Sequence, residues 1–210
     1  YAVSEASETS SIDAVMKAVD EKDVAILVNN VGIGQGGPKK LHQTESGHVE
    51  RMITVNCIYP TLLTRAMLPL MLGRQSRSLI VNISSVTATV HTPFNTVYAA
   101  TKAFNRLFSL SMAGEYVADG IDTLCVCPGL VESNMSGSKV GALVCSAEEC
   151  AEGALKSAGL IECIPHWKHI LMVWPITVLG QWLTPAICQA WFDRHVLRTA
   201  YRRRFPKADI

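Results

Sequence analysis

The sequence alternates between short apolar runs and longer stretches in which apolar residues recur every three or four positions. The apolar runs are residues 24–28, 78–83 and 121–126. They have the length and continuity of strands that are buried on both faces of a parallel sheet. The other stretches have the apolar spacing of helices and are residues 14–19, 45–72, 97–117 and 146–156. Strands that alternate with helices predict an α/β fold with a parallel sheet and helices on both faces.

Glycines follow the first apolar run. The run ends in Asn-Asn-Val-Gly, which begins at Asn29, and Gly32 then opens a G-x-G-x-x-G string. This string is the fingerprint of a dinucleotide-binding turn when a helix follows it and an acidic residue ends a second strand about 20 residues later. Pro38 and further polar residues follow instead. We therefore predict a flexible glycine loop at the end of a strand.

A proline interrupts the longest helical stretch. Pro60 has no N–H, so the carbonyl of Asn56, four residues earlier, loses its helical partner and is free to hold a water. A lone asparagine in a helix is more often a solvated or capping side chain. Its position relative to Pro60 favours a role for Asn56 in a site.

Candidate chemistry gathers in residues 81–102. Tyr98 and Lys102 are four residues apart, so on a helix they share one face, where an ammonium favours the phenolate form of a tyrosine. Taken alone, each is more often a partly buried aromatic or a solvated charge. Ser84 and Ser85 end the preceding strand, and a serine there could hold a carbonyl oxygen while Tyr98 delivers a proton to it. The helix is expected to pack through an apolar face made of Val97, Ala100, Phe104, Leu107, Phe108 and Met112.

A turn follows the third apolar run. It is formed by Pro128 and Gly129, and Ser133 lies four residues after Gly129. By itself a Pro-Gly pair indicates only a turn. Residues 136–141 suit a mobile lid over a substrate, and Ser146 with Glu149 predicts a capping box for the next helix.

Composition narrows the function classes. The 210 residues are 49% hydrophobic with a formal net charge of +1, which suits one large core and argues against disorder and nucleic-acid binding. Seven scattered cysteines without a signal-peptide pattern favour a reducing compartment. Cys125 and Cys127 are closer than the C-x-x-C spacing of zinc sites, so we expect small buried side chains there. We predict no metal site, and we expect His166 and His169 at a surface or an interface.

Residues 161–210 differ in character from the rest. Residues 170–187 are largely apolar, but Pro175, Gly180 and Pro185 interrupt them, which argues against a straight membrane span of about 20 residues. A basic run follows them. We predict a domain of residues 1–160 and an extension of residues 161–210 that contacts a membrane surface, a substrate or a second copy. A core helix with a solvated tail is the alternative.

The motifs are more specific as an ordered set than one by one. The set resembles the short-chain dehydrogenase/reductase family over about residues 25–149 and looks like its branch of very-long-chain 3-oxoacyl-CoA reductases and 17-beta-hydroxysteroid dehydrogenases. In chain order it comprises Asn-Asn-Val-Gly, the Val-Asn pair that ends at Asn56, Ser85, Tyr98, Lys102 and Pro128-Gly129.

The resemblance implies a Rossmann-like doubly wound sheet and a carbonyl reduction that uses NADP(H) in preference to NAD(H). It implies catalytic roles for four residues, with Ser85 preferred to Ser84 because of its distance to Tyr98; the four are Asn56, Ser85, Tyr98 and Lys102. The expected cofactor contacts are Asn29, Gly32, Tyr98, Lys102, Pro128, Gly129 and Ser133. The expected substrate is a lipid-like carbonyl, either a 3-oxoacyl-CoA of fatty acid elongation or a 17-ketosteroid.

Members of this branch lie in the endoplasmic reticulum membrane, so the resemblance also implies that location, with the active site facing the cytoplasm and a homodimer as one assembly. The sequence departs from the family in one respect. Only 28 residues precede Asn29, so we expect an N-terminally truncated fold that lacks the first strands and the Gly-rich turn that binds the pyrophosphate. The rival hypothesis is an inactive fragment or a pseudoenzyme that acts only as a binding partner.

Overall fold

The structure is a computed structural model that describes residue 6, residues 11–178 and residue 190. Within these residues four strands form one parallel sheet in the order β1-β2-β3-β6. Their bounds are Ile26–Asn29 for β1, Ser78–Ile83 for β2, Ile121–Val126 for β3 and Glu162–Cys163 for β6. The predicted α/β fold is therefore confirmed, and β2 and β3 have the bounds that their apolar runs predict.

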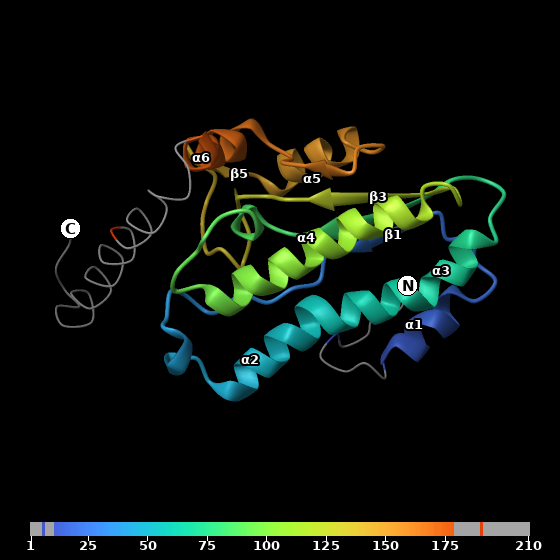
Figure 1. The fold of residues 1–210 in the computed structure, drawn as a ribbon, viewed down its shortest axis with the longest axis horizontal. Coiled ribbons are helices and arrows are strands. Elements are labelled where there is room, and N and C mark those ends of the chain that lie inside the picture. Colours follow the sequence, from blue (N-terminus) through green and yellow to red (C-terminus); the bar gives the residue numbers. More distant parts are fainter. Residues whose placement is uncertain (1–5, 7–10, 179–189, 191–210) are drawn as a thin grey trace.

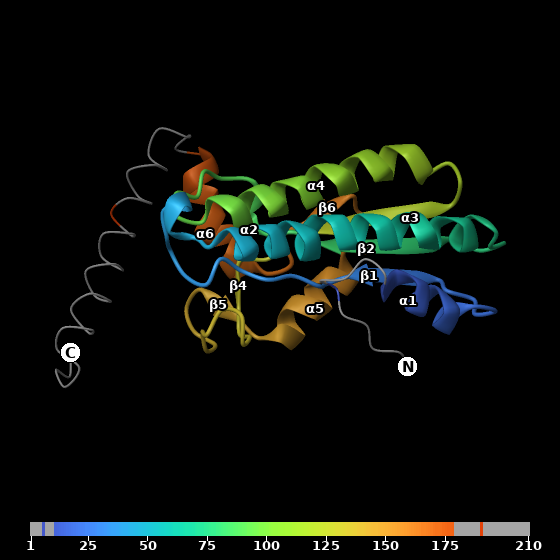
Figure 2. The ribbon, with the colours of Figure 1, turned by 90° about the horizontal axis from the view of Figure 1, so that it is seen from below.

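Helices cover the two faces of the sheet unequally (Figures 1 and 2). One face carries α1 (Ser11–Val19), α2 (Ser46–Ile53), α3 (Tyr59–Leu72) and α4 (Thr96–Tyr116), and the other carries α5 (Ala147–Lys156). α6 (Trp167–Val178) lies beyond the carboxyl end of β3. The short elements are η1 (Leu41–Gln43), η2 (Thr54–Ile58), η3 (Val86–Ala88) and the parallel pair of β4 (Leu130–Val131) with β5 (Val144–Cys145).

Two apolar clusters hold these layers together. Methionines of α3 and α4 pack on Ile80 of β2 and Ile121 of β3 beneath the face covered by four helices. On the other face Val81 and Leu124 pack with Ala154 of α5. Alternate residues of each strand thus enter different clusters, as the two-residue period of a strand requires.

The outer strand β1 does not fit the expectation of a strand buried on both faces. Ile26 and Val28 pair with Leu79 and Val81, which places them on the α5 face, and each is 55% exposed. Cys163 of β6 and Ala154 of α5 pack over β2 and β3 on this face. Among the described residues, this cover does not extend to β1.

The apolar face predicted for α4 is confirmed only in part. Met112 and Phe108 pack in the core cluster, but Phe104 and Leu107 are exposed. Thr101, Asn105 and Ser109 are buried against the sheet instead. The buried polar side chains find partners: Ser109 Oγ accepts from the side chain of Asn82 at 2.9 Å and donates to the carbonyl of Asn105 at 2.6 Å. Hydrogen bonding, which apolar periodicity does not register, therefore sets the face that α4 turns inward.

A widened turn replaces the continuous helix predicted for residues 45–72. η2 is a π-helical turn between α2 and α3, closed by the N–H of Tyr59 on the carbonyl of Thr54. Pro60 follows at the start of α3 and cannot bond to a carbonyl four residues earlier. The wider turn accommodates this missing donor, and π-turns of this kind are frequent at functional sites.

Residues Ser46–Leu72 are long and apolar enough to cross a membrane by length and composition, with 44% of the relevant window buried inside the structure. Met67 and Met71 of this segment belong to the main core cluster, as expected for a core helix of the α/β fold. Of the predicted C-terminal extension, residues 162–163 form β6 and residues 167–178 form α6. Residues 179–187 and the basic run that follows lie outside the described residues.

Candidate active site

The predicted catalytic side chains come from three elements that meet at the carboxyl edge of the sheet. Ser85 follows β2, Tyr98 and Lys102 lie in the first turns of α4, and Asn56 lies in the π-turn η2. Because β1, β2 and β3 are parallel, the segments that follow them emerge at this one edge. The fold thus brings together residues that are up to 46 positions apart, from Asn56 to Lys102.

Lys102 is buried at the centre of this group. Its Nζ donates a hydrogen bond of 2.9 Å to the carbonyl of Ile83 and lies 5.8 Å from the centre of the Tyr98 ring. Burial lowers the pKa of Lys102 to about 8, and the neighbouring thiol of Cys57 opposes this shift. The ammonium therefore persists at neutral pH and is lost just above it.

The tyrosine behaves differently from the expectation that Lys102 favours its phenolate. Burial raises the pKa of Tyr98, and a hydrogen bond with Ser85 opposes that shift in part. The ammonium of Lys102 is bonded to Ile83 and lies beside the ring, so burial dominates. Tyr98 is accordingly a neutral phenol at physiological pH, the form that can donate a proton.

The two candidate serines have different partners. Ser84 donates its hydroxyl to the carbonyl of Lys102 at 2.7 Å, which ties the end of β2 to α4. Ser85 accepts a hydrogen bond of 3.2 Å from the N–H of Thr87 and interacts with the hydroxyl of Tyr98. Ser85 therefore contacts Tyr98, whereas Ser84 holds α4 against the end of β2.

Asn56 is fully buried and joins the glycine loop to α4. Its Oδ1 accepts from the N–H of Ile33 at 2.8 Å, and its Nδ2 donates to the carbonyl of Ile33 and to Thr101 Oγ1, each at 3.0 Å. Thr101 in turn donates to the carbonyl of Tyr98 at 2.8 Å. Sequence analysis missed Thr101, and the signal was present, because a threonine hydroxyl in a helix can bond to the carbonyl three residues earlier.

The residues predicted to contact a cofactor near β1 fall into two groups. A side chain at Gly32 would lie 3.5 Å from both Asn56 Oδ1 and Lys102 Nζ, so the bare backbone there leaves open space beside the two polar groups. Asn29 donates to Thr64 at 2.9 Å and to Asn82 at 2.7 Å inside the core. Gly32 therefore borders the site, whereas the side chain of Asn29 joins β1 to β2 and α3.

The glycine loop is held by a residue that sequence analysis also missed. Gln35 is buried, and its Nε2 donates to the carbonyls of Lys39 and Phe94 at 3.1 and 3.0 Å. This contact joins the loop to the segment between Ser85 and Tyr98. No helix begins at the loop, as predicted, and the next helical element is η1.

The turn after β3 lies between the site and α6. The carbonyl of Pro128 accepts a hydrogen bond of 3.0 Å from the N–H of Val86, next to Ser85. A Cβ on Gly129 would lie 2.7 Å from Cδ2 of His169, so only glycine lets α6 approach this closely. Ser133 is exposed and accepts from the N–H of Ser136 at 3.2 Å.

The expectation that His169 lies at a surface or an interface is wrong. Its side chain is fully buried, with Nε2 3.0 Å from the carbonyl of Leu130 and 3.5 Å from Cys145 Sγ. Burial lowers the pKa of His169, which keeps the ring neutral. The residue therefore anchors α6 on the turn that follows β3.

Comparison with known proteins agrees with this geometry. The sequence model of the short chain dehydrogenase family matches residues 2–142. The chain belongs to this family. One similar protein is a hydroxysteroid dehydrogenase-like protein 1 of Gallus gallus, which is 30% identical over 191 residues, covering 88% of this chain and 56% of the relative.

A second relative of this short-chain dehydrogenase is a very-long-chain 3-oxoacyl-CoA reductase of Anas platyrhynchos, 32% identical over 174 residues, which covers 80% of this chain and 54% of the relative. The chain thus spans just over half the length of these curated relatives. Among solved structures, a short-chain dehydrogenase from Sphingobium yanoikuyae in complex with NADPH is 27% identical, with a TM-score of 0.70 over 82% of this chain and 69% of that one. These neighbours confirm the Rossmann-like fold.

Proposed function

We propose that this chain carries the catalytic residues of an NADPH-dependent carbonyl reductase that acts on a 3-oxoacyl-CoA or a 17-ketosteroid. The observation that carries the proposal is the grouping of buried Ser85 and Lys102 with the half-buried neutral phenol of Tyr98 at the carboxyl edge of a parallel sheet. A hydroxyl that can hold an oxygen beside a phenol that can donate a proton suits the reduction of a carbonyl. The names of the two relatives support the two substrate classes.

Each residue has a separate task in this proposal. Ser85 donates a hydrogen bond to the carbonyl oxygen of the substrate, and Tyr98 delivers the proton to the same oxygen. Lys102 keeps a positive charge near the developing alkoxide, and Asn56 holds the loop of Ile33 in place through its two amide contacts. A nicotinamide cofactor, when bound, supplies the hydride to the carbonyl carbon.

The residues present fit the nicotinamide end of such a cofactor. The space beside Gly32 borders both Lys102 Nζ and Asn56 Oδ1, and Pro128 and Gly129 follow β3 at the same edge. Lys102 is the residue we propose for the ribose hydroxyls. Within the described residues, no glycine-rich turn leads into a helix that could hold the pyrophosphate. The preference for NADPH over NADH is proposed from the family resemblance alone, since similar solved structures include complexes with either cofactor.

The surroundings of the site suggest where the protein acts. We propose, from the resemblance, that it lies at the endoplasmic reticulum membrane with the site facing the cytoplasm. Within residues 161–210, residues 162–163 belong to the sheet, so we propose that the part from α6 onward contacts the membrane surface. Trp167, Leu171 and Trp174 of α6 are exposed, as would suit an interface. Phe104 and Leu107 on the outer side of α4 are exposed as well and support a homodimer.

The experiment is an assay of reduced-nicotinamide consumption with a very-long-chain 3-oxoacyl-CoA and, separately, a 17-ketosteroid. Tyr98→Phe should lower the rate by roughly 10²–10⁴-fold, because the proton donor is lost. Tyr116→Phe is the matched control, since Tyr116 lies on the same helix and packs in the core cluster away from the site. A Tyr98→Phe variant that keeps its rate would contradict the proposed mechanism.

A second candidate function is cofactor-independent binding by an inactive homologue. The observation that favours it is the lack, among the described residues, of a turn for the pyrophosphate. Titration with NADPH separates the two. Micromolar binding supports the reductase, whereas a chain that melts cooperatively and binds no NADPH supports the binding protein.

A further inference from the structure

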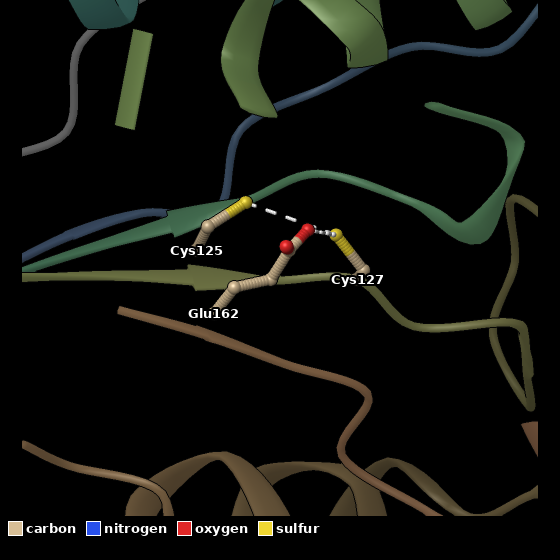
Figure 3. Close-up of side chains that lie close together, drawn as sticks. All are labelled: Cys125, Cys127 and Glu162. Atoms are coloured by element: carbon tan, nitrogen blue, oxygen red, sulfur yellow. Dashed lines mark hydrogen bonds between the residues drawn. The ribbon is translucent and has the colours of Figure 1, made fainter. Parts of the chain in front are cut away.

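A second cluster of reactive side chains lies on β3 and β6, apart from the residues assigned to the reductase. Cys125 and Cys127 leave β3 on the face that α4 covers, and Glu162 lies on β6 directly beside Cys125 in the sheet register. Figure 3 shows the two thiols and the carboxylate converging on one small volume. Sequence spacing did not reveal this group, because the carboxylate is 35 residues from Cys127.

The distances within the cluster suit a tetrahedral ion. Cys125 Sγ lies 3.7 Å from Cys127 Sγ, and Cys127 Sγ lies 3.4 Å from Glu162 Oε1. A zinc ion with bonds of about 2.3 Å to sulfur and about 2.0 Å to oxygen requires about 3.8 Å between two sulfur ligands and about 3.5 Å between sulfur and oxygen. The three ligand atoms all lie within 4.8 Å of one another, so small rotamer adjustments bring them onto one ion.

Arg106 orients the carboxylate of this cluster. It donates from Nε to Glu162 Oε1 and from Nη2 to Glu162 Oε2, at 2.5 and 2.8 Å. A carboxylate oxygen has two lone pairs, so Oε1 can accept from Arg106 and still face the sulfur of Cys127. Outer hydrogen bonds of this kind fix the direction of metal-binding carboxylates.

The charges also suit a divalent cation. Two thiolates and one carboxylate beside one guanidinium sum to a charge of about −2, which one divalent ion neutralises. Without an ion the two cysteines are thiols within hydrogen-bonding distance of each other. Binding of the ion would therefore release thiol protons to solvent.

A cavity gives access to the cluster. It has a volume of about 270 Å³ and is lined by Cys127, Glu162 and Arg106 together with the apolar side chains of Val86 and Val173. A water from this cavity can serve as the fourth ligand that a tetrahedral ion needs.

We propose that Cys125, Cys127 and Glu162 form a binding site for a thiophilic divalent cation of the zinc class, with three protein ligands and one open position. The ion joins β3 to β6 and, through Arg106, to α4. The site does not depend on the reductase function, and its test does not use activity.

The test uses the whole chain, reduced and freed of metal, in equilibrium dialysis against Zn²⁺ with elemental analysis of the bound ion. We expect one tightly held Zn²⁺ per chain and, with Co²⁺ as a spectroscopic probe, the charge-transfer absorption of a thiolate-bound tetrahedral ion. The double variant Cys125→Ser with Cys127→Ser should lose affinity by at least about 100-fold, and Glu162→Gln by about 10-fold. Zn²⁺ should also raise the melting temperature of the wild type and not that of the double variant.

Cys57→Ser and Cys150→Ser are the control variants. Cys57 lies in η2 and Cys150 lies in α5, and neither lines the cavity. Both should bind Zn²⁺ as the wild type does. If the double serine variant fails to fold, the single variant Cys127→Ala replaces it, with the same expected loss of the Co²⁺ absorption. No stoichiometric binding, or binding that only the control variants lose, overturns the proposal.

Discussion

The two faces of the sheet carry different kinds of residue. The face under α1, α3 and α4 holds a buried hydrogen-bonded chain that runs from Asn29 through Asn82 to Ser109, and the ammonium of Lys102. The face under α5 holds an aliphatic cluster and leaves Val28 of β1 exposed. The buried amides and the ammonium of Lys102 thus lie on the face that long helices shield from water.

The difference follows from the cost of burying polar groups. A buried amide or ammonium is tolerated only where partners satisfy it. α4 supplies such partners with its own polar side chains and with the carbonyl of Asn105. α5 has no buried residue among those described and offers apolar contact instead. One face therefore combines the main apolar cluster with buried hydrogen bonds, whereas the other is held by apolar packing. Four sets of variants test this contrast.

The largest change in the free energy of unfolding is expected on the α5 face, where α5 packs closely against its neighbours. Gly153 of α5 lies so close to the chain at Pro165 that a Cβ there would overlap the carbonyl oxygen of Pro165. Gly153→Ala should therefore lower the free energy of unfolding by more than about 3 kcal/mol, because backbone has to move. Chemical denaturation measures this value.

The control for this variant is Gly114→Ala on α4. Gly114 lies inside a helix with no atom near the position of a Cβ. Alanine there should raise stability by up to about 1 kcal/mol through helix propensity. Equal effects of the two substitutions would show that α5 is not held by close approach.

The next largest effect is expected from a substitution that removes hydrogen bonds on the opposite face. Asn82 accepts from Asn29 and donates to Ser109, and all three side chains are buried. Asn82→Ala leaves polar groups without partners and a small cavity, and should cost about 2–3 kcal/mol of unfolding free energy. Asn134→Ala, at an exposed asparagine in the loop after β4, should change stability by less than about 0.5 kcal/mol. A small loss at Asn82 would mean that water replaces the chain of amides.

The sequence predicted β2, β3, the capping box of α5 and the order of the motifs, because those features depend on local pattern. The sequence-based prediction was wrong where a contact with a residue far away in the sequence determines the structure. The exposed face of β1 depends on which helices cover it, and the inward face of α4 depends on Asn82, 27 residues before Ser109. No local pattern contains such information.

The candidate site shows the same division. Spacing alone placed Tyr98 and Lys102 on one helix face, and the structure brings Ser85 to them. The pKa of Tyr98 is raised by burial, where spacing predicted a net lowering by Lys102, because the degree of burial cannot be predicted from spacing. The proximity of Glu162 to Cys125 could not be predicted from the sequence either, since β6 lies beside β3 only in the folded sheet.

A third variant should raise stability. Burial lowers the pKa of Lys102 from 10.5 to about 8, so the folded state binds the proton less tightly than the unfolded state. Below about pH 8 the buried ammonium of Lys102 lowers the free energy of unfolding by its full amount. This cost diminishes as the pH rises from about 8 toward 10.5. Lys102→Met should therefore be more stable than the wild type at pH 7, by about 1–2 kcal/mol, and the difference should shrink across that window.

Denaturation at pH 7 and pH 10 measures this difference. Lys156→Met provides the control, because Lys156 is exposed and forms an ion pair with Glu152 on the surface of α5. Loss of reductase activity together with a gain in stability would identify Lys102 as a residue kept for chemistry. A less stable Lys102→Met would show that the bond to the carbonyl of Ile83 outweighs the cost of burial.

The smallest effect is expected at the edge of the sheet. Val28 of β1 and Val81 of β2 are paired in register on the α5 face, and they differ in exposure, at 55% and 6%. Threonine has nearly the volume of valine but replaces a methyl group with a hydroxyl, so Val→Thr measures the cost of burying that hydroxyl. Val28→Thr should change the unfolding free energy by less than about 0.5 kcal/mol, whereas Val81→Thr should cost about 1–2 kcal/mol because its hydroxyl enters an apolar cluster. Equal costs at both positions would mean that β1 is covered in solution, for instance by a second copy of the chain, and the concentration dependence of the melting temperature would then reveal that partner.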